Sequence, residues 1–155
     1  MAVKIRPLVL GDIAALTAWL LETEAWQAYG YSERRSTQML ERALKRSDFL
    51  IVAEEKKQLL GFAWSQPGGA FGRSGYLRFI VVQPKKVGKG IGTQLLAEVE
   101  EFTGAVSNDL FTLLSPDMVA KGFFEAHGYE GVGELESYSF DTPEIIYRKR
   151  LAQPD

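Results

Sequence analysis

The chain has 155 residues, 46% of them hydrophobic and 25% charged, a composition typical of a folded globular protein. Its 18 Lys and Arg nearly balance its 20 Asp and Glu, and the formal net charge of −2 argues against nucleic acid or an anionic membrane as a partner. The absence of cysteine excludes disulfides, a cysteine nucleophile and thiolate metal sites.

The single histidine, His127, precedes Gly128 at the expected end of a helix. Zinc sites and Ser-His-Asp triads need histidine in a defined setting, so neither a metal site nor a triad is expected. We expect His127 to interact with the last carbonyl groups of its helix. The apolar run from Ile13 to Leu21 is too short to cross a bilayer, and no signal peptide is recognisable. A cytoplasmic protein with no membrane partner is the simplest interpretation.

The first third of the chain predicts a strand followed by two helices. Val3–Val9 has a strand-like pattern, and Asp12 is a suitable N-cap for the helix after it. The apolar face of this helix consists of Ile13, Leu16 and Leu20. A second helix is expected after Ser36, with Leu40 and Leu44 on its apolar face.

Three strands are expected next. Phe49–Glu54 and Leu59–Trp64 are separated by a charged tetrapeptide, the pattern of a hairpin. Tyr76–Val82 follows the turn-rich segment Gln66–Gly75. These strands predict an antiparallel meander.

The last part of the chain predicts a helix, a strand, a helix and two strands. The first helix has an apolar stripe made of Ile91, Leu95, Leu96, Val99 and Phe102. Leu110–Leu114 should pair parallel to its neighbour because a helical crossover leads to it. Ser115 can cap the next helix with Pro116 in its first position, and Gly128 can end it. With no repeat or long linker, the elements predict one domain over residues 1–155, of α/β (α+β) class. We expect a mixed central sheet of about six or seven strands flanked by about four helices.

The glycine-rich turn Gly88-Lys89-Gly90-Ile91-Gly92 carries the clearest chemical signal. Glycines let successive N–H groups point into one concavity, and the helix start adds about half a positive charge, so an anion fits there. Lys85, Lys86 and Lys89 raise the local potential. A turn that binds nothing is the plainer alternative. A Walker loop does not match because Thr93 does not follow a lysine, and a dinucleotide fingerprint does not match because the preceding strands look antiparallel.

The motifs at residues 82–92 (Val82-Gln83-Pro84 and the glycine-rich turn) and 123–129 resemble two signatures of the Gcn5-related N-acetyltransferase (GNAT) family. The family's cofactor loop, Gln/Arg-x-x-Gly-x-Gly/Ala after a strand that ends in Val-x-Pro, is similar to Val82-Gln83-Pro84 followed by residues 87–92. A second signature, Phe-Tyr-x-x-x-Gly-Phe, is similar to residues 123–129. The expected order of elements also matches the family over nearly the whole chain.

The resemblance implies acetyl-coenzyme A as co-substrate, with no metal. Its pyrophosphate would rest on the amides of residues 87–93, and its pantetheine arm would pair with the strand backbone. The implied cofactor-binding residues are Ile80, Val81, Val82, Val87, Gly88, Lys89, Gly90, Ile91, Gly92, Thr93, Asp117 and Phe124. Val87 replaces the family's Gln or Arg, and Asp117 stands where the family usually has Asn.

The catalytic groups are less clearly indicated. Phe124 replaces a tyrosine that in the family often protonates the departing thiolate, and we expect it to pack beside Phe123. Water, Ser115 or a nearby tyrosine could supply the proton. Glu22 and Glu24 are candidates for the base that deprotonates an amine, although solvated charges at a helix end are the simpler interpretation.

The acceptor is not identified by the sequence. In the family, the region corresponding to Ala25–Tyr31 lines the acceptor pocket, so Trp26, Tyr29 and Tyr31 are the candidate substrate-binding residues; core packing is the alternative. Gln66–Ser74 could be a lid or a long hairpin loop.

The resulting hypothesis is acetyl transfer from acetyl-coenzyme A to a primary amine of a small molecule or peptide, by direct attack in a ternary complex. The alternatives are a non-catalytic acyl-coenzyme A-binding module and a structural or dimerising domain. A homodimer is conceivable if Ile145–Leu151 is an edge strand.

Overall fold

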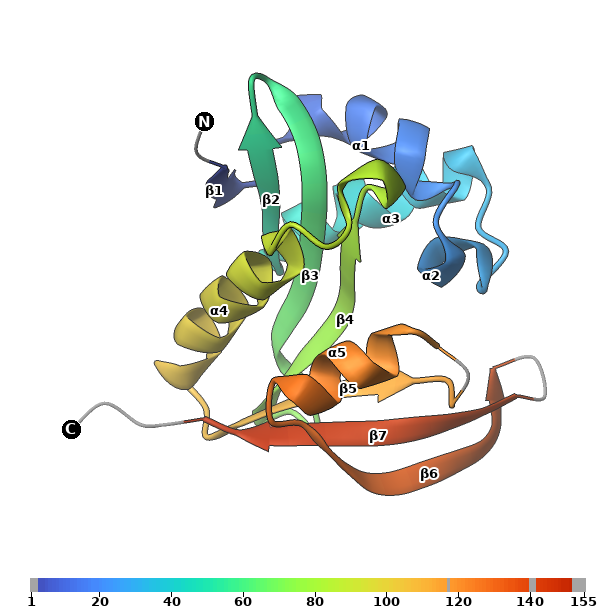
Figure 1. Cartoon of the computed structure of the whole chain (residues 1–155), viewed down its shortest axis with the longest axis vertical. Helices are drawn as coiled ribbons and strands as arrows, with labels where there is room; N and C mark the ends of the chain where they lie inside the picture. The colour runs from blue at the N-terminus through green and yellow to red at the C-terminus, as the bar shows by residue number, and fades with distance from the viewer. Residues whose placement is uncertain (1–2, 117, 140–141, 152–155) are drawn as a thin grey trace. The chain divides into compact units, whose positions relative to one another are not determined.

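The computed structural model describes residues 3–116, 118–139 and 142–151. Two compact units are present, an N-terminal unit (residues 1–65 and 79–99) and a C-terminal unit (residues 66–78 and 100–155). The hydrogen-bonded strand order is β1-β2-β3-β4-β5-β7-β6, a mixed seven-stranded sheet (Figure 1). Five α-helices and two short 3-10 turns accompany the sheet in the described residues. The predicted fold class is therefore confirmed.

The N-terminal unit contains an antiparallel arrangement of β1 (Lys4–Pro7), β2 (Phe49–Glu55) and the first part of β3 (Gln58–Ala70). Lys56 and Lys57 form the turn between β2 and β3 with φ angles of 50° and 64°. Positive φ at both turn residues matches the twist of a hairpin, which confirms the predicted β2–β3 hairpin.

The helices of this unit are α1 (Ile13–Leu20), α2 (Glu24–Gln27) and α3 (Glu33–Lys45). Ser36 was the wrong start for the second predicted helix. The N-cap of α3 is Ser32, whose Oγ accepts from the Arg35 N–H at 3.1 Å. Ser36 is fully buried one turn later, where its hydroxyl donates to the Ser32 carbonyl at 2.8 Å.

Asp12 occupies the N-cap position of α1, but its side chain makes no cap bond to that helix. Its carboxylate instead accepts from the Val9 N–H at 2.9 Å and from the Arg6 guanidinium at 2.8 and 2.9 Å. Arg6 also donates to Glu54 at 3.0 Å. The hydrogen bonds from Arg6 lower the pKa of both carboxyl groups and raise the pKa of Arg6. This cluster ties β1 and β2 to the 3-10 turn Leu10–Asp12.

The core of the N-terminal unit is rich in aromatic side chains. Trp26, Phe62 and Trp64 are almost fully buried, and Phe79 packs against Trp26 with ring centroids 4.6 Å apart. Helix α4 (Ile91–Gly104) begins in this unit, and four of its predicted stripe residues are buried. They are Ile91, Leu95, Leu96 and Val99. Phe102, the last of the predicted stripe, is 38% exposed.

The C-terminal unit contains the start of β4 (Ser74–Val82), β5 (Asp109–Leu114), α5 (Ala120–Ala126), β6 (Glu130–Ser139) and β7 (Thr142–Arg150). Strands β4 and β5 pair in parallel, as predicted. The expectation that the terminal strand lies at a sheet edge was wrong, because β7 pairs with β5 on one side and with β6 on the other.

Two other expectations for this unit were also wrong. Ser115 does not cap α5, which starts at Ala120 with Val119 as N-cap. The Met118 N–H donates to the Ser115 carbonyl at 3.1 Å, and Pro116 suits such a turn as well as it suits a helix start. The segment Gln66–Ser74 is not a long loop, because β3 runs to Ala70 and β4 starts at Ser74.

The predicted role of His127 is confirmed. It is the C-cap residue of α5, and its Nδ1 lies 2.8 Å from the Phe123 carbonyl oxygen, so Nδ1 carries the proton that is donated. Gly128 follows with φ of 90°, a value that favours glycine and ends the helix. No helix in the described ranges is long and apolar enough to cross a bilayer.

Candidate functional site

The glycine-rich turn joins β4 to α4. The Gln83 N–H donates to the Leu60 carbonyl at 2.8 Å and fixes the end of β4 against β3. The 3-10 turn Pro84–Lys86 follows, and then Gly88 and Gly90 adopt φ angles of 87° and 81°. These left-handed conformations cost glycine little and reverse the chain just before α4 begins.

The donors of this turn are available to a ligand. In the part of the chain that the structure describes, no backbone N–H from Gly88 to Gly92 donates a well-formed hydrogen bond to another protein group. Unpaired donors at a helix start attract anions. Lys85 and Lys89 are exposed beside the turn. A pocket of about 420 Å³ adjoins it, and its lining includes Lys86, Lys89 and Gln94 together with one carboxylate, Glu55. The donor set fits a phosphate group.

The strand that precedes the turn offers main-chain groups as well. Pairing between β4 and β5 joins Gly75, Tyr76 and Leu77 to residues 110–112. Strand β4 continues to Val82, and the pairing with β5 does not extend to Ile80–Val82 among the described residues. This edge of the backbone can therefore accept an extended ligand arm as an added strand.

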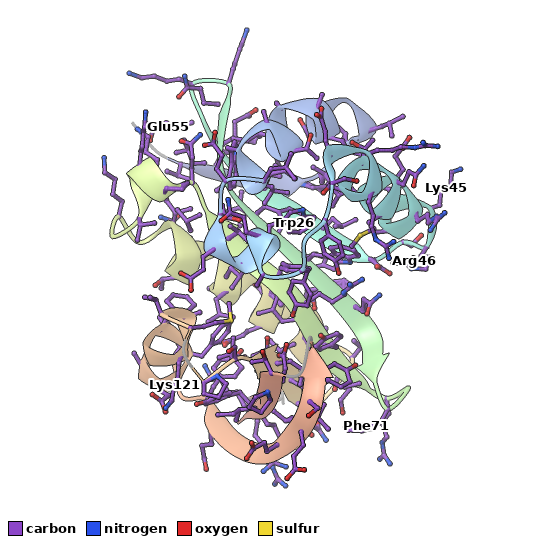
Figure 2. All side chains as sticks on the ribbon, turned by 90° about the vertical axis from the view of Figure 1, so that its right-hand side faces the viewer. Trp26, Lys45, Arg46, Glu55, Phe71 and Lys121 are labelled. Carbon is purple, nitrogen blue, oxygen red and sulfur yellow. The ribbon has the colours of Figure 1, made fainter. Side chains whose placement is uncertain are left out.

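Trp26 lies inside the N-terminal unit. Its exposure is 0%, and its Nε1 donates to the buried Ser36 Oγ at 2.7 Å (Figure 2). It cannot stack on a substrate in this arrangement, so that expectation is corrected in favour of core packing. Tyr29 and Tyr31 are half-buried and stack on each other at 5.5 Å with an interplanar angle of 8°. They are the aromatic side chains of this segment that a ligand could still contact.

The candidate catalytic residues are divided between the two units. Glu22 and Glu24 are exposed, with Glu24 in the first turn of α2. Ser115 belongs to the turn before α5. Asp117, the expected pantetheine contact, lies outside the described residues.

Phe124 packs where it was expected to pack, in the interior of the C-terminal unit. It is 1% exposed and contacts Phe123 at 5.3 Å and Tyr129 at 5.2 Å between ring centroids. The Tyr129 hydroxyl donates to Glu100 at 2.7 Å. Burial, and then this hydrogen bond, raise the pKa of Tyr129 far above its usual range. Tyr129 is therefore a poor proton donor to a leaving thiolate.

Two features of the structure were not found from the sequence, one beside the aromatic candidates and one on β7. Phe79 joins the Trp26 and Tyr29 rings, but a phenylalanine inside an apolar strand gives no distinguishing signal. Glu144 is a carboxylate on β7 that is only 5% exposed. Its neighbours Pro143 and Ile145 gave no pattern from which its burial could be predicted.

Comparison with known proteins decides the family. A model of the acetyltransferase (GNAT) family matches residues 13–129, about three quarters of the chain. The chain belongs to this family. The match covers α1 to Tyr129 and so includes the glycine-rich turn, and the resemblance of the two motifs is confirmed.

Solved structures of N-acetyltransferases share the fold. An N-acetyltransferase from Staphylococcus aureus Mu50 superposes with a TM-score of 0.79 at 20% identity, over 98% of this chain and 100% of that one. The PaiA N-acetyltransferase from Thermoplasma acidophilum, solved in complex with coenzyme A, gives 0.77 at 21% identity over 97% and 99%. A ribosomal-protein-alanine N-acetyltransferase from Brucella melitensis gives 0.77 at 25% identity over 96% and 99%.

Proposed function

We propose that this GNAT-family protein transfers an acetyl group from acetyl-coenzyme A to a primary amine by direct attack in a ternary complex. The observation that carries the proposal is the run of N–H groups from Gly88 to Gly92 that have no partner in the described chain. In this proposal they hold the pyrophosphate, together with Val87, Thr93 and the nearby lysines. Such a site uses backbone donors, so Val87 in place of Gln or Arg removes only side-chain contacts.

The free edge of β4 has two tasks in this mechanism. Its main chain at Ile80–Val82 pairs with the pantetheine arm and places the thioester. One of its N–H groups then donates to the oxygen of the tetrahedral intermediate, and this kind of stabilisation is usually the largest contribution in acyl transfer. The amine nitrogen forms the new bond to the carbonyl carbon, and the carbon–sulfur bond breaks to release the thiolate. The nitrogen gives up its excess proton to water or to the thiolate, which leaves a neutral amide.

Two proton movements accompany the transfer, one at the amine and one at the departing thiolate. An amine with a pKa of about 10.4 must lose a proton before it attacks, and Glu22 or Glu24 can take that proton directly or through water. A thiol with a pKa of about 8.5 leaves readily as thiolate, so a transfer without a tyrosine at position 124 is slowed rather than abolished. A positioned acid contributes roughly 10²- to 10⁴-fold in rate.

The buried Phe124 favours a second candidate, a module that binds acyl-coenzyme A without catalysis. At 1% exposure the side chain serves the interior of the C-terminal unit and offers no hydroxyl. This candidate shares the cofactor site with the first and differs only in turnover.

Thermal unfolding with acetyl-coenzyme A tests the site. At a hundred times its dissociation constant the ligand should add about 2.7 kcal/mol, which raises the melting temperature by roughly 5–10 °C. An unchanged melting temperature would contradict both candidates and leave a structural domain.

Release of coenzyme A then separates catalysis from binding. The amine panel should include a peptide with N-terminal alanine, because the Brucella neighbour is named for that acceptor. Polyamines, free lysine and aminoglycosides complete the panel. Binding without release of coenzyme A with any amine would favour the non-catalytic module.

A further inference from the structure

Strand β6 is the outer strand of the sheet in the C-terminal unit, and one of its two edges is open. In the strand order it follows β7 and has no further neighbour among the described residues (Figure 1). It contains ten residues, and all its described side chains are exposed except the half-buried Leu135. An edge of this length presents a row of backbone N–H and C=O groups that can pair with another chain.

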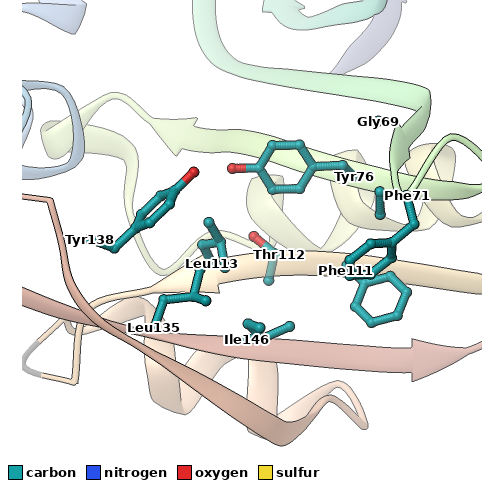
Figure 3. A pocket seen from close by; sticks show the side chains of 10 residues that line it. Gly69, Phe71, Tyr76, Phe111, Thr112, Leu113, Leu135, Tyr138 and Ile146 are labelled. Carbon is teal, nitrogen blue, oxygen red and sulfur yellow. The ribbon is translucent and has the colours of Figure 1, made fainter.

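The inner edge of β6 holds the strand in place. Its pairing with β7 extends from Glu130 to Ser139. Two of its side chains, Leu135 and Tyr138, line a pocket of about 350 Å³ in this unit (Figure 3). The strand is therefore anchored along one side, and its free edge forms a fixed template for an added strand.

Two glycines of β6 are not required by the fold of this chain. Gly131 and Gly133 have no positive φ, so they differ from the glycine of a turn or of a glycine-type bulge. A Cβ added to Gly131 would lie 3.4 Å from Ile145 Cγ2, and one added to Gly133 would lie 3.5 Å from Ile146 Cδ1, which are ordinary contact distances. Glycine inside a strand weakens it and often marks the close approach of another backbone. Such an approach from the open edge accounts for both glycines.

The charged side chains of β6 are all negative. The strand contains neither lysine nor proline, the residues that commonly protect a sheet edge from pairing. Glu130, Glu134 and Glu136 are exposed and have no ion pair in the part of the chain that the structure describes. Glu134 lies opposite Ile145 of β7, so the neighbouring strand offers it no cation. The open edge therefore combines unpaired backbone groups with unpaired carboxylates.

These charges decide between two occupants of the edge. A second copy of β6 would bring two sets of the same three carboxylates together, and like charges across a strand pair are destabilising. A strand rich in Lys or Arg would instead place cations beside the glutamates. Backbone pairing supplies affinity in this kind of recognition, and complementary charge selects the partner. The edge therefore fits a basic strand better than a copy of itself.

We propose that the open edge of β6 binds an extended basic peptide segment of a partner protein as an added β-strand. Backbone hydrogen bonds align the segment along residues 130–138, and its Lys or Arg side chains pair with the glutamates of β6. The interaction is separate from the proposed acetyl transfer, because it uses no group of the cofactor loop.

The probe is the heptapeptide Arg-Thr-Arg-Val-Arg-Thr-Arg, with fluorescein on its N-terminus and an amidated C-terminus. It has no primary amine, so it cannot be an acceptor in the proposed transfer. Fluorescence anisotropy with the whole chain should show saturable binding. The peptide Arg-Pro-Arg-Pro-Arg-Pro-Arg keeps the four cations but cannot form a regular strand ladder, and it should bind at least about tenfold more weakly. Equal binding of the two peptides, or no saturable binding, would overturn the proposal.

The double variant Glu134→Gln with Glu136→Gln removes two charges and keeps the size of the side chains. We expect it to bind the heptapeptide about 3- to 10-fold more weakly, with an unchanged melting temperature. The matched control, Glu98→Gln with Glu101→Gln, makes the same change of charge at exposed positions of α4. It should leave the affinity nearly unchanged because salt screens distant charges. An equal loss in both double variants would mean unspecific attraction and would contradict the site.

Hydrogen–deuterium exchange followed by mass spectrometry locates the contact. Saturating heptapeptide should slow the exchange of backbone amides in residues 130–138, because these groups gain hydrogen-bond partners. Residues 33–45 of α3 are the internal reference and should not change. Unchanged exchange in β6 would refute the proposed edge. Protection of β6 that rises with protein concentration without peptide would identify a second copy as the occupant and would also overturn the proposal.

Discussion

Gly88 and Gly90 in the β4–α4 turn are required by the backbone conformation and not by lack of space for a side chain. A Cβ added at Gly88 or Gly90 would meet no atom within 4 Å, so space does not demand glycine there. The φ angles of 87° and 81° do, because residues with a side chain rarely adopt them. In the proposed cofactor site, the conformation of these two residues positions the N–H groups that hold the pyrophosphate.

The variant Gly90→Ala tests whether the conformation of this turn supports acetyl-coenzyme A binding, and Gly30→Ala is its control. Both glycines have positive φ and open surroundings, so each substitution should lower the free energy of unfolding by about 1 kcal/mol. Only Gly90→Ala should also weaken acetyl-coenzyme A binding, by about tenfold, because its methyl group and altered φ disturb the phosphate donors. Calorimetric titration measures the affinity and urea unfolding the stability. Equal affinities in the two variants would count against the proposed pyrophosphate site.

One hydrogen bond shows that Trp26 is a core residue and not a substrate-binding residue. Trp26 looked like a substrate contact because Ala25–Tyr31 contains three aromatic residues and the corresponding region of the family lines the acceptor pocket. Its indole N–H is used by Ser36, ten positions later in the chain, at 2.7 Å. A buried indole that finds its partner in the protein is a structural residue.

At the level of elements, close packing of helix on strand depends on glycine in β4. A Cβ at Gly75 would lie 2.5 Å from Thr103 Cγ2 of α4 and 3.1 Å from Leu110 Cδ1 of β5. Thr103 is 2% exposed and β-branched, so it has little freedom to move. The approach of the end of α4 to the sheet in the C-terminal unit needs this missing side chain.

Gly75→Ala should accordingly destabilise the protein by about 1–3 kcal/mol through overpacking. Gly122→Ala in α5 is the opposite case, since nothing lies within 4 Å of its added Cβ. Replacing a helical glycine by alanine should stabilise by about 0.5–1 kcal/mol. Urea denaturation of both variants measures the difference, and a Gly75→Ala protein as stable as the parent would show that α4 can shift away.

For the whole molecule, we propose that the two units form one domain over residues 1–155. Strands β3 and β4 and helix α4 each begin in one unit and end in the other. Unfolding of either unit would break elements that the other needs. A homodimer remains a prediction, and its original basis is gone because β7 is not an edge strand.

Coincident unfolding curves are therefore expected. All three tryptophans, Trp19, Trp26 and Trp64, belong to the N-terminal unit, so their fluorescence reports on that unit alone. Far-ultraviolet circular dichroism follows the helices and strands of both. The two probes should give the same urea midpoint and slope. A fluorescence transition displaced from the dichroism transition would mean that the units unfold separately.

Local patterns in the sequence were enough for most of the elements and for the glycine-rich turn. The β2–β3 hairpin, the apolar stripe of α4 and the helix end at His127 and Gly128 all depend on residues close together in the chain. Helix capping, hairpin turns and helical periodicity involve residues that are close together in the chain, so a short stretch of sequence is enough to predict them. The family motifs are local for the same reason, and they led to the acetyltransferase family.

Contacts between distant residues were decided only by the tertiary structure. Ser32 and Ser36 are both plausible helix caps, and the choice follows from the burial of Ser36 against Trp26. The inner position of β7 depends on its pairing with β5, more than thirty residues earlier in the chain. A pocket of about 350 Å³ in the C-terminal unit likewise collects residues from five separate strands, β3 to β7. Such neighbours are set by strand order and packing, which no short stretch of sequence specifies.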